Sequence, residues 1–229
     1  MRAHTGRILA LAVLFWCGAA SGNAVRAQAP ASSSRGATAG SAQGEAPSPT
    51  RWNAWSPIDN PHVRVTAEAA ATAAPVSTLP QVRIWLDGHV QYLQPGAHPE
   101  THAAPSSRGP AAAEIVIELK DTQIPPHKNG TSYPLAFPRP GSRKVLENDR
   151  VVVWDYSWTP GSPTPMHFHD KDVVVTYLED GALRSTEPNG QSVVNPHYFG
   201  FTKFNAGDRT HTEELIRGKG RAIIVELKR

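Results

Sequence analysis

The chain has 229 residues, a formal net charge of +3, and 39% hydrophobic residues. This length allows one large or two small domains. The net charge is small and the basic residues are scattered, so nothing in the composition indicates a nucleic-acid-binding surface, and we expect no nucleic-acid partner.

Residues 1–27 have the features of a secretory signal peptide. Arg2 and Arg7 give a positive start, Ile8 to Ala20 is almost entirely apolar, and Val25-Arg26-Ala27 offers small residues before a cleavage point. The apolar run is too short to span a bilayer. We therefore expect an exported protein, periplasmic or secreted, without stable membrane insertion after the signal is removed.

Cys17, the only cysteine, lies inside this segment, so the mature chain would lack disulfides, thiolate ligands and a thiol nucleophile. Any metal would then be held by nitrogen and oxygen atoms. Residues 28–50 consist mainly of Ala, Ser, Gly and Pro, and they cannot bury enough apolar surface to offset the entropy of ordering. We interpret them as a disordered tether.

The remainder of the chain contains an internal repeat. Three pairs of segments match in the same order: Asn60 to Thr66 with Asn148 to Trp154, Val82 to Gly88 with Val174 to Gly181, and Glu114 to Lys120 with Ala222 to Lys228. The repeat predicts two versions of one module, at 51–121 and 146–229, joined by a Pro-rich linker at 122–145.

Both modules are predicted to be β structure. Their apolar residues are β-branched or aromatic and form short runs between turn residues. In the second module we expect strands over 152–158, 172–178, 199–204 and 222–227, with a hairpin turn at Pro188-Asn189-Gly190. Many short strands at this spacing indicate a sandwich or closed barrel.

The main functional signal is the pair His167 and His169. Residues two apart on a strand project from the same face, so both imidazoles would converge on one point. Chance, or solvation on an edge strand, is the simpler explanation of such a pair. His211 favours a metal site, because an antiparallel barrel can bring it beside the pair. Three imidazoles suit one divalent transition metal, Fe, Mn, Zn, Ni or Co, and leave positions for water or a ligand.

These residues resemble the first motif of the cupin superfamily, in which Gly, five residues and His-x-His precede a carboxylate and a later Gly. Gly161, His167, His169 and Gly181 match it, and Gly207 with His211 loosely match the second motif. The resemblance implies an all-β fold of double-stranded β-helix (jelly-roll) barrels. With the repeat, it implies a bicupin whose second barrel holds the metal on His167, His169 and His211.

The sequence departs from the motif in two places. Val174 occupies the position of the family's glutamate, so a fourth ligand would have to come from Asp172 or Glu213. Asp172 would point away from the pair in a regular strand unless a bulge redirects it. His211 follows Gly207 by one residue more than the family spacing, which reverses its face unless a bulge absorbs the shift.

The first module lacks the histidine pair. Pro75 and Ser77 fall opposite the two histidines, whereas His98 and His102 are interpreted as surface residues. We therefore predict one metal ion per chain, and a first module that covers or extends the second barrel.

Three functions remain open for the metal site. The first is a metal-dependent enzyme acting on a small molecule, for which the resemblance implies oxygenases, isomerases or lyases; the fold does not choose among them. The second is a small-ligand-binding protein without catalysis, and the third is a structural protein in which the metal stabilises the barrel. Glu213 is the candidate for proton transfer, and the candidate pocket residues are Tyr156, Trp158, Arg184 and Arg209. The sequence leaves open whether the chain forms a homodimer.

Overall fold

The computed structural model describes residues 52–69, 76–100, 102, 113–120 and 127–228. Fourteen strands and no helix occur in this described part of the chain, which confirms the predicted all-β class. Accordingly, it contains no helix long and apolar enough to cross a membrane. The predicted signal peptide and tether lie outside the described residues.

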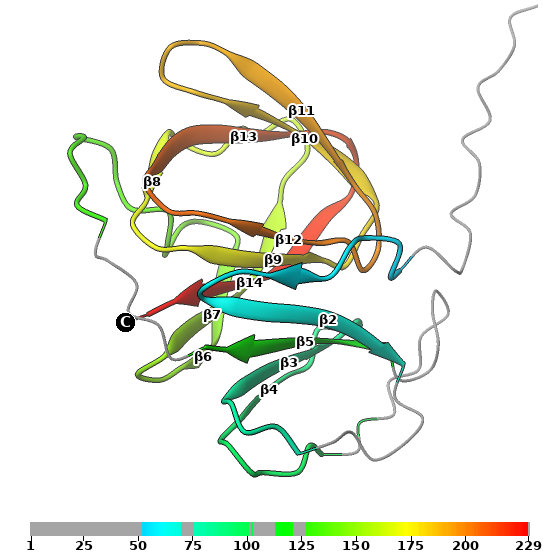
Figure 1. The fold of residues 1–229 in the computed structure, drawn as a ribbon. Coiled ribbons are helices and arrows are strands. Elements are labelled where there is room, and N and C mark those ends of the chain that lie inside the picture. The colour runs from blue at the N-terminus through cyan, green and yellow to red at the C-terminus, as the bar shows by residue number, and fades with distance from the viewer. Residues whose placement is uncertain (1–51, 70–75, 101, 103–112, 121–126, 229) are drawn as a thin grey trace, which may run out of the picture. The chain divides into compact units, whose positions relative to one another are not determined.

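Two antiparallel sheets face one another in the C-terminal part of the chain (Figure 1). The first sheet has the order β12-β9-β14-β7-β6, and the second has the order β11-β10-β13-β8. The strands of the first sheet are β6 (Ser142–Glu147), β7 (Val151–Trp158), β9 (Val173–Tyr177), β12 (Thr202–Asn205) and β14 (Gly220–Leu227). Those of the second sheet are β8 (His167–His169), β10 (Gly181–Thr186), β11 (Ser192–His197) and β13 (Arg209–Gly218).

The N-terminal strands form a third sheet, with the order β1-β2-β5-β3-β4. Its strands are β1 (Ile58–Asp59), β2 (Val63–Ala69), β3 (Gln81–Trp85), β4 (Val90–Leu93) and β5 (Ala113–Leu119). The three repeated segments fall on β2 and β7, β3 and β9, and β5 and β14. Strand for strand, the third sheet therefore has the order of the first barrel sheet.

The same turn precedes β2 and β7. The side-chain oxygens of Asn60 and Asn148 each accept hydrogen bonds from the backbone N–H groups two and three residues later. At the other end of the repeat, the amide groups of Lys120 and Lys228 each donate to a carbonyl within that turn. The sequence repeat thus corresponds to a structural repeat of one sheet.

A second complete barrel, as in a bicupin, is not seen in the described part of 52–120. These residues supply a counterpart of one barrel sheet, and no counterparts of β8, β10, β11 and β13 occur among them. The N-terminal sheet instead packs against the outer face of the first barrel sheet (Figure 1).

Alternation along β7 shows how one strand serves two cores. Val151 and Val153 point outward into the core shared with the N-terminal sheet, where Val65 and Ile117 are fully buried. The neighbouring side chain of Trp154 points into the barrel. Because both faces of this sheet are covered, its strands are apolar on both sides.

The barrel begins before residue 146. Strand β6 starts at Ser142, inside the stretch assigned to the linker, and Phe137 packs in the barrel core beside Trp154. The Pro-rich stretch therefore contributes to the barrel in its described part, 127–145.

Candidate metal centre

His167 and His169 lie on β8 and project into the barrel. Strand β8 pairs with β13 in an antiparallel register that sets His211 opposite His167 and Arg209 opposite His169. Paired residues of antiparallel strands share a face, so the three imidazoles meet on one side of the ladder. Their ring centroids lie 4.9 to 5.1 Å apart.

A turn before β13 accommodates the extra residue between Gly207 and His211. Asp208 has a φ of 55°, in the left-handed region, and its N–H donates to the carbonyl of His169 at 2.8 Å. This irregular turn restores the inward face of His211, which sequence spacing left uncertain.

The three histidines are buried, at 2%, 6% and 7% exposure for His167, His169 and His211. Burial, assisted by nearby Arg139, lowers the pKa of His167 to about 4. Burial also lowers the pKa of His169 well below its usual value and lowers that of His211. All three imidazoles are therefore neutral at physiological pH, which is the form that binds a metal.

The arrangement of the ring nitrogens fits a transition-metal ion. One potential ligand atom from each histidine lies within 4.8 Å of the other two. The Nδ1 atom of His167 lies 2.8 Å from the carbonyl of Pro165, so a proton on Nδ1 makes Nε2 the unprotonated nitrogen of this ring. The Nε2 atoms of His169 and His211 lie 3.3 Å apart, which matches the separation of about 3.3 Å expected for two nitrogens on tetrahedral zinc.

Arg139 and Glu213 form an ion pair beside the triad. A guanidinium nitrogen of Arg139 lies 2.7 Å from Nε2 of His167, and another donates to Glu213 at 3.0 Å. The indole N–H of Trp158 also donates to Glu213 at 3.0 Å. Arg139 therefore occupies the lone-pair direction of His167 and would have to shift when a metal binds there.

Glu213 faces inward, as its candidate role requires. Burial alone would raise its pKa, but Arg139 and the neighbouring histidines outweigh burial and lower the pKa to about 2. Glu213 is therefore ionised at neutral pH, where it can accept hydrogen bonds but is poorly suited to donate a proton. Its Oε1 atom lies 3.8 Å from Nε2 of His211.

Asp172 is not brought to the triad. Its Oδ1 atom accepts the N–H of Gly207 at 2.6 Å and lies 3.4 Å from Nε2 of His127, and its Oδ2 atom lies 3.8 Å from Nε2 of His62. Asp172 follows the connection between β8 and β9, and these contacts hold its carboxylate away from the pair.

Only some of the candidate pocket residues line the cavity. Arg209 and Trp158 line the cavity next to the triad. Tyr156 is buried in the barrel core, and its ring lies 4.2 Å from the guanidinium carbon of Arg139. Arg184 lies on the outer face of β10 and pairs with Glu214 at 2.9 Å, so it does not reach the cavity.

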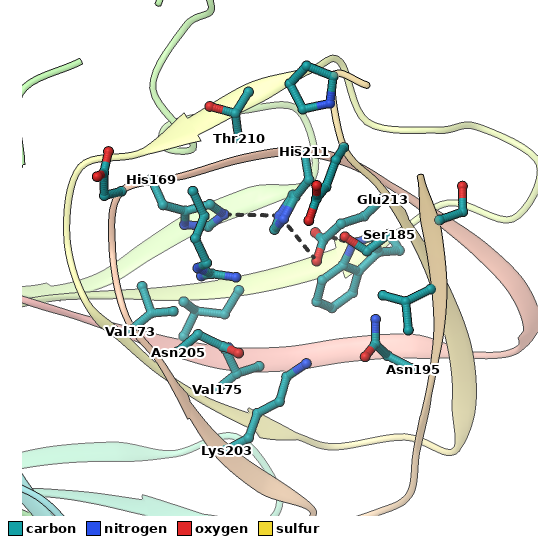
Figure 2. A pocket seen from close by; sticks show the side chains of 18 of the residues that line it. His169, Val173, Val175, Ser185, Asn195, Lys203, Asn205, Thr210, His211 and Glu213 are labelled. Atoms are coloured by element: carbon teal, nitrogen blue, oxygen red, sulfur yellow. Dashed lines mark hydrogen bonds and ion pairs between the residues drawn. The ribbon is translucent and has the colours of Figure 1, made fainter. Parts of the chain in front are cut away.

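Two members of the triad, His169 and His211, line a cavity of about 630 Å³ inside the barrel (Figure 2). The cavity is also lined by Lys203 and Asn205 on β12 and by Ser185 and Asn195 on the β10–β11 hairpin. Sequence reasoning missed these residues and Arg139. The only available signal was alternation along short strands, which does not identify the enclosed face.

The described histidines of the first module make no such cluster. His98 is exposed, whereas His102 stacks on His89 and lies 2.8 Å from an Asp87 oxygen. Over the described residues, the triad is the only group with metal-ligand geometry.

Two facing antiparallel sheets with three histidines turned into the barrel form a double-stranded β-helix with a potential metal site. No protein-family model and no curated protein matches the sequence. The fold is similar to several solved cupin structures. A cupin domain from Bordetella pertussis Tohama I is 25% identical, with a TM-score of 0.36, covering 44% of this chain and 100% of that chain.

Two further solved structures resemble the chain. A cupin 2 conserved barrel domain protein from Leptotrichia buccalis is 12% identical, with a TM-score of 0.39, covering 75% of this chain and 86% of that chain. The polyketide cyclase RemF from Streptomyces resistomycificus is 17% identical, with a TM-score of 0.31, covering 46% of this chain and 80% of that chain.

Proposed function

We propose that this protein is an exported metal-binding cupin that holds one divalent transition-metal ion on His167, His169 and His211 and acts on a small molecule in the barrel. The observation that carries this proposal is the convergence of three buried imidazoles, two of which, His169 and His211, line a cavity. The described carboxylates do not close the ligand set, because Asp172 is bound elsewhere and Glu213 is paired with Arg139.

A bound ion would supply Lewis acidity or an activated water at its open positions. The chain's own residues prepare the site around it. Glu213 holds Arg139 and Trp158 by hydrogen bonds, so a guanidinium and an indole ring are fixed beside the triad. Apolar side chains of Val173 and Val175 form part of the opposite wall and limit the space for water.

Ligand binding without catalysis is the second candidate function. The observation that favours it is the low pKa of Glu213, about 2, which makes this carboxylate a weak base. If the protein is an enzyme of the oxygenase, isomerase or lyase class, the ion itself or the substrate would have to provide the reactive group. Spectroscopy of the cobalt-substituted protein separates a site with exchangeable water from a closed, purely structural one.

Metal analysis tests the site. The protein purified from its native compartment should contain about one transition-metal ion per chain, consistent with three ligands. His167→Ala and His169→Ala should each abolish loading, whereas His197→Asn should retain it, because buried His197 stacks on Tyr177 outside the triad. Full loading of the His167→Ala protein would show that the site is misassigned.

Export is proposed from the N-terminal sequence alone. The charged start, the apolar run and the small residues around position 27 support removal of a signal peptide. N-terminal sequencing of the protein from its native source should give a chain that starts near residue 28. A protein that retains Met1 in the cytoplasm would contradict the proposal.

A further inference from the structure

Two positively charged side chains line the cavity without a carboxylate partner. Lys203 and Arg209 both line its wall, and no Asp or Glu oxygen among the described residues lies within 4 Å of their charged nitrogens. The third cation that lines the cavity, Arg139, is paired with Glu213. Lys203 and Arg209 therefore differ from Arg139, because neither has a carboxylate partner.

The strand registers explain why both side chains point inward. Lys203 on β12 pairs with Val175 on β9, and Val175 belongs to the barrel core. Arg209 on β13 pairs with His169 on β8. Figure 2 shows the ammonium group of Lys203 reaching into the cavity from the wall opposite His211 and Glu213.

Both side chains are half-buried, so they lose part of their hydration, and a nearby negative charge would compensate for that loss. This partial burial lowers the pKa of Lys203. The contacts made by these two side chains supply only weak compensation: the ammonium of Lys203 lies 5.7 Å from the ring centre of Tyr177, and Nε of Arg209 donates to the carbonyl of Ala206.

The remaining charges around the cavity compensate for them only in part: Glu213 attracts both cations and Asp172 attracts Arg209, but neither carboxylate lies within 4 Å of their charged nitrogens. Glu213 already holds Arg139, and the other two acidic lining residues, Glu187 and Asp208, are exposed. The neutral histidines would leave both charges of a divalent ion uncompensated. Asn195, Asn205 and Ser185 add neutral hydrogen-bonding groups to the cavity walls (Figure 2).

We infer that the ligand of this cavity is a small organic carboxylate whose negative charge is held by Lys203 and Arg209 beside the metal centre. This inference rests on the proposed function, because it places the anion next to the ion on the histidine triad. Lys203 and Arg209 are assigned as specificity-determining residues that discriminate an acid from its neutral amide. The unpaired charges carry this assignment, since a site built for a neutral ligand would not retain them without compensation.

Binding of malonate, with malonamide as the uncharged control, tests the inference. The zinc-loaded protein is titrated with each compound by calorimetry, and malonate is expected to bind at least about tenfold more tightly because charge-assisted hydrogen bonds are lost with the amide. Lys203→Met and Arg209→Met should each weaken malonate binding about tenfold or more. Zinc content should remain at the wild-type level in both.

Lys144→Met is the matched control, because Lys144 is exposed and bonds to Glu147 on β6. It should leave malonate binding unchanged. Lys203→Met should also keep or raise the thermal unfolding midpoint, since it removes a half-buried charge that has no carboxylate partner. A purely structural lysine would lower the midpoint and leave malonate affinity intact, which would overturn the inference.

The outcomes distinguish the two proposals. A wild-type protein that loads no metal refutes the proposed function. A zinc-loaded protein that binds malonate and malonamide equally, or binds neither, refutes the carboxylate inference and leaves the metal site standing. If Lys203→Met fails to fold, Arg209→Met supplies the same comparison from the other sheet.

Discussion

Acid should destabilise the metal-free protein through its buried histidines, and His167 allows the effect to be estimated. The pKa of His167 is about 4 in the folded chain and about 6.5 in an unfolded chain. Below the unfolded value, the unfolded state binds a proton that the folded state does not, so stability falls with pH until the folded value is passed. A full shift of this size corresponds to about 3 kcal/mol, of which about 2 kcal/mol is lost between about pH 7 and about pH 5.

The assay is urea unfolding of the metal-free protein in a chelating buffer, repeated across that pH range. His167→Asn should reduce the pH-dependent loss of unfolding free energy by about 2 kcal/mol relative to the wild type. The comparison uses the slope with pH, so a uniform destabilisation of the variant does not affect it. His98→Asn, at an exposed position, serves as the control and should keep the wild-type slope.

Equal losses in the wild type and in His167→Asn would refute the reasoning. That result would mean that His167 accepts a proton as readily in the folded chain as in the unfolded one. The lowered pKa values of His169 and His211 act in the same direction and should make the total loss of the wild type larger.

Two further predictions concern the packing of the N-terminal sheet. Ile115→Ala removes a fully buried side chain from the core shared by this sheet and the barrel and should lower the unfolding free energy by about 2 to 5 kcal/mol, whereas Val76→Ala, at a position 42% exposed, should change it by less than about 0.5 kcal/mol; equal effects in denaturant unfolding would contradict the described core. Gly200→Ala should destabilise more than Gly190→Ala: both glycines have a positive φ of 81° or 84°, but a Cβ at Gly200 would overlap the carbonyl of Trp52 and one at Gly190 meets nothing. Matching thermal midpoints for these two variants would show that the contact with Trp52 is absent.

Local patterns in the sequence determined the fold class and the centre of the site. Short runs of β-branched and aromatic residues predicted the strands, and alternation placed His167 and His169 on one face. The internal repeat predicted related modules because equivalent turns, such as those at Asn60 and Asn148, need equivalent residues. These are interactions between residues that are close in the chain.

Tertiary structure decided which distant groups join the pair. His211 faces inward only because the turn at Asp208 absorbs one residue, and Asp172 is excluded from the triad because it binds Gly207. Arg139 comes from a stretch that composition marked as a linker, and Lys203 comes from an edge strand four residues long. Nothing in the sequence marks either residue as part of the site, since a single Lys or Arg beside turn residues is typical of the solvated surface.

The histidine pair could therefore be identified from its spacing alone, whereas the charge of its surroundings could not. A spacing of two on a strand fixes the relative direction of two side chains, whatever the rest of the fold does. The partners of a charged side chain depend on which strands are paired across the barrel. This pairing places Lys203 and Arg209 in the cavity. Arg184 stays outside the cavity, bound to Glu214.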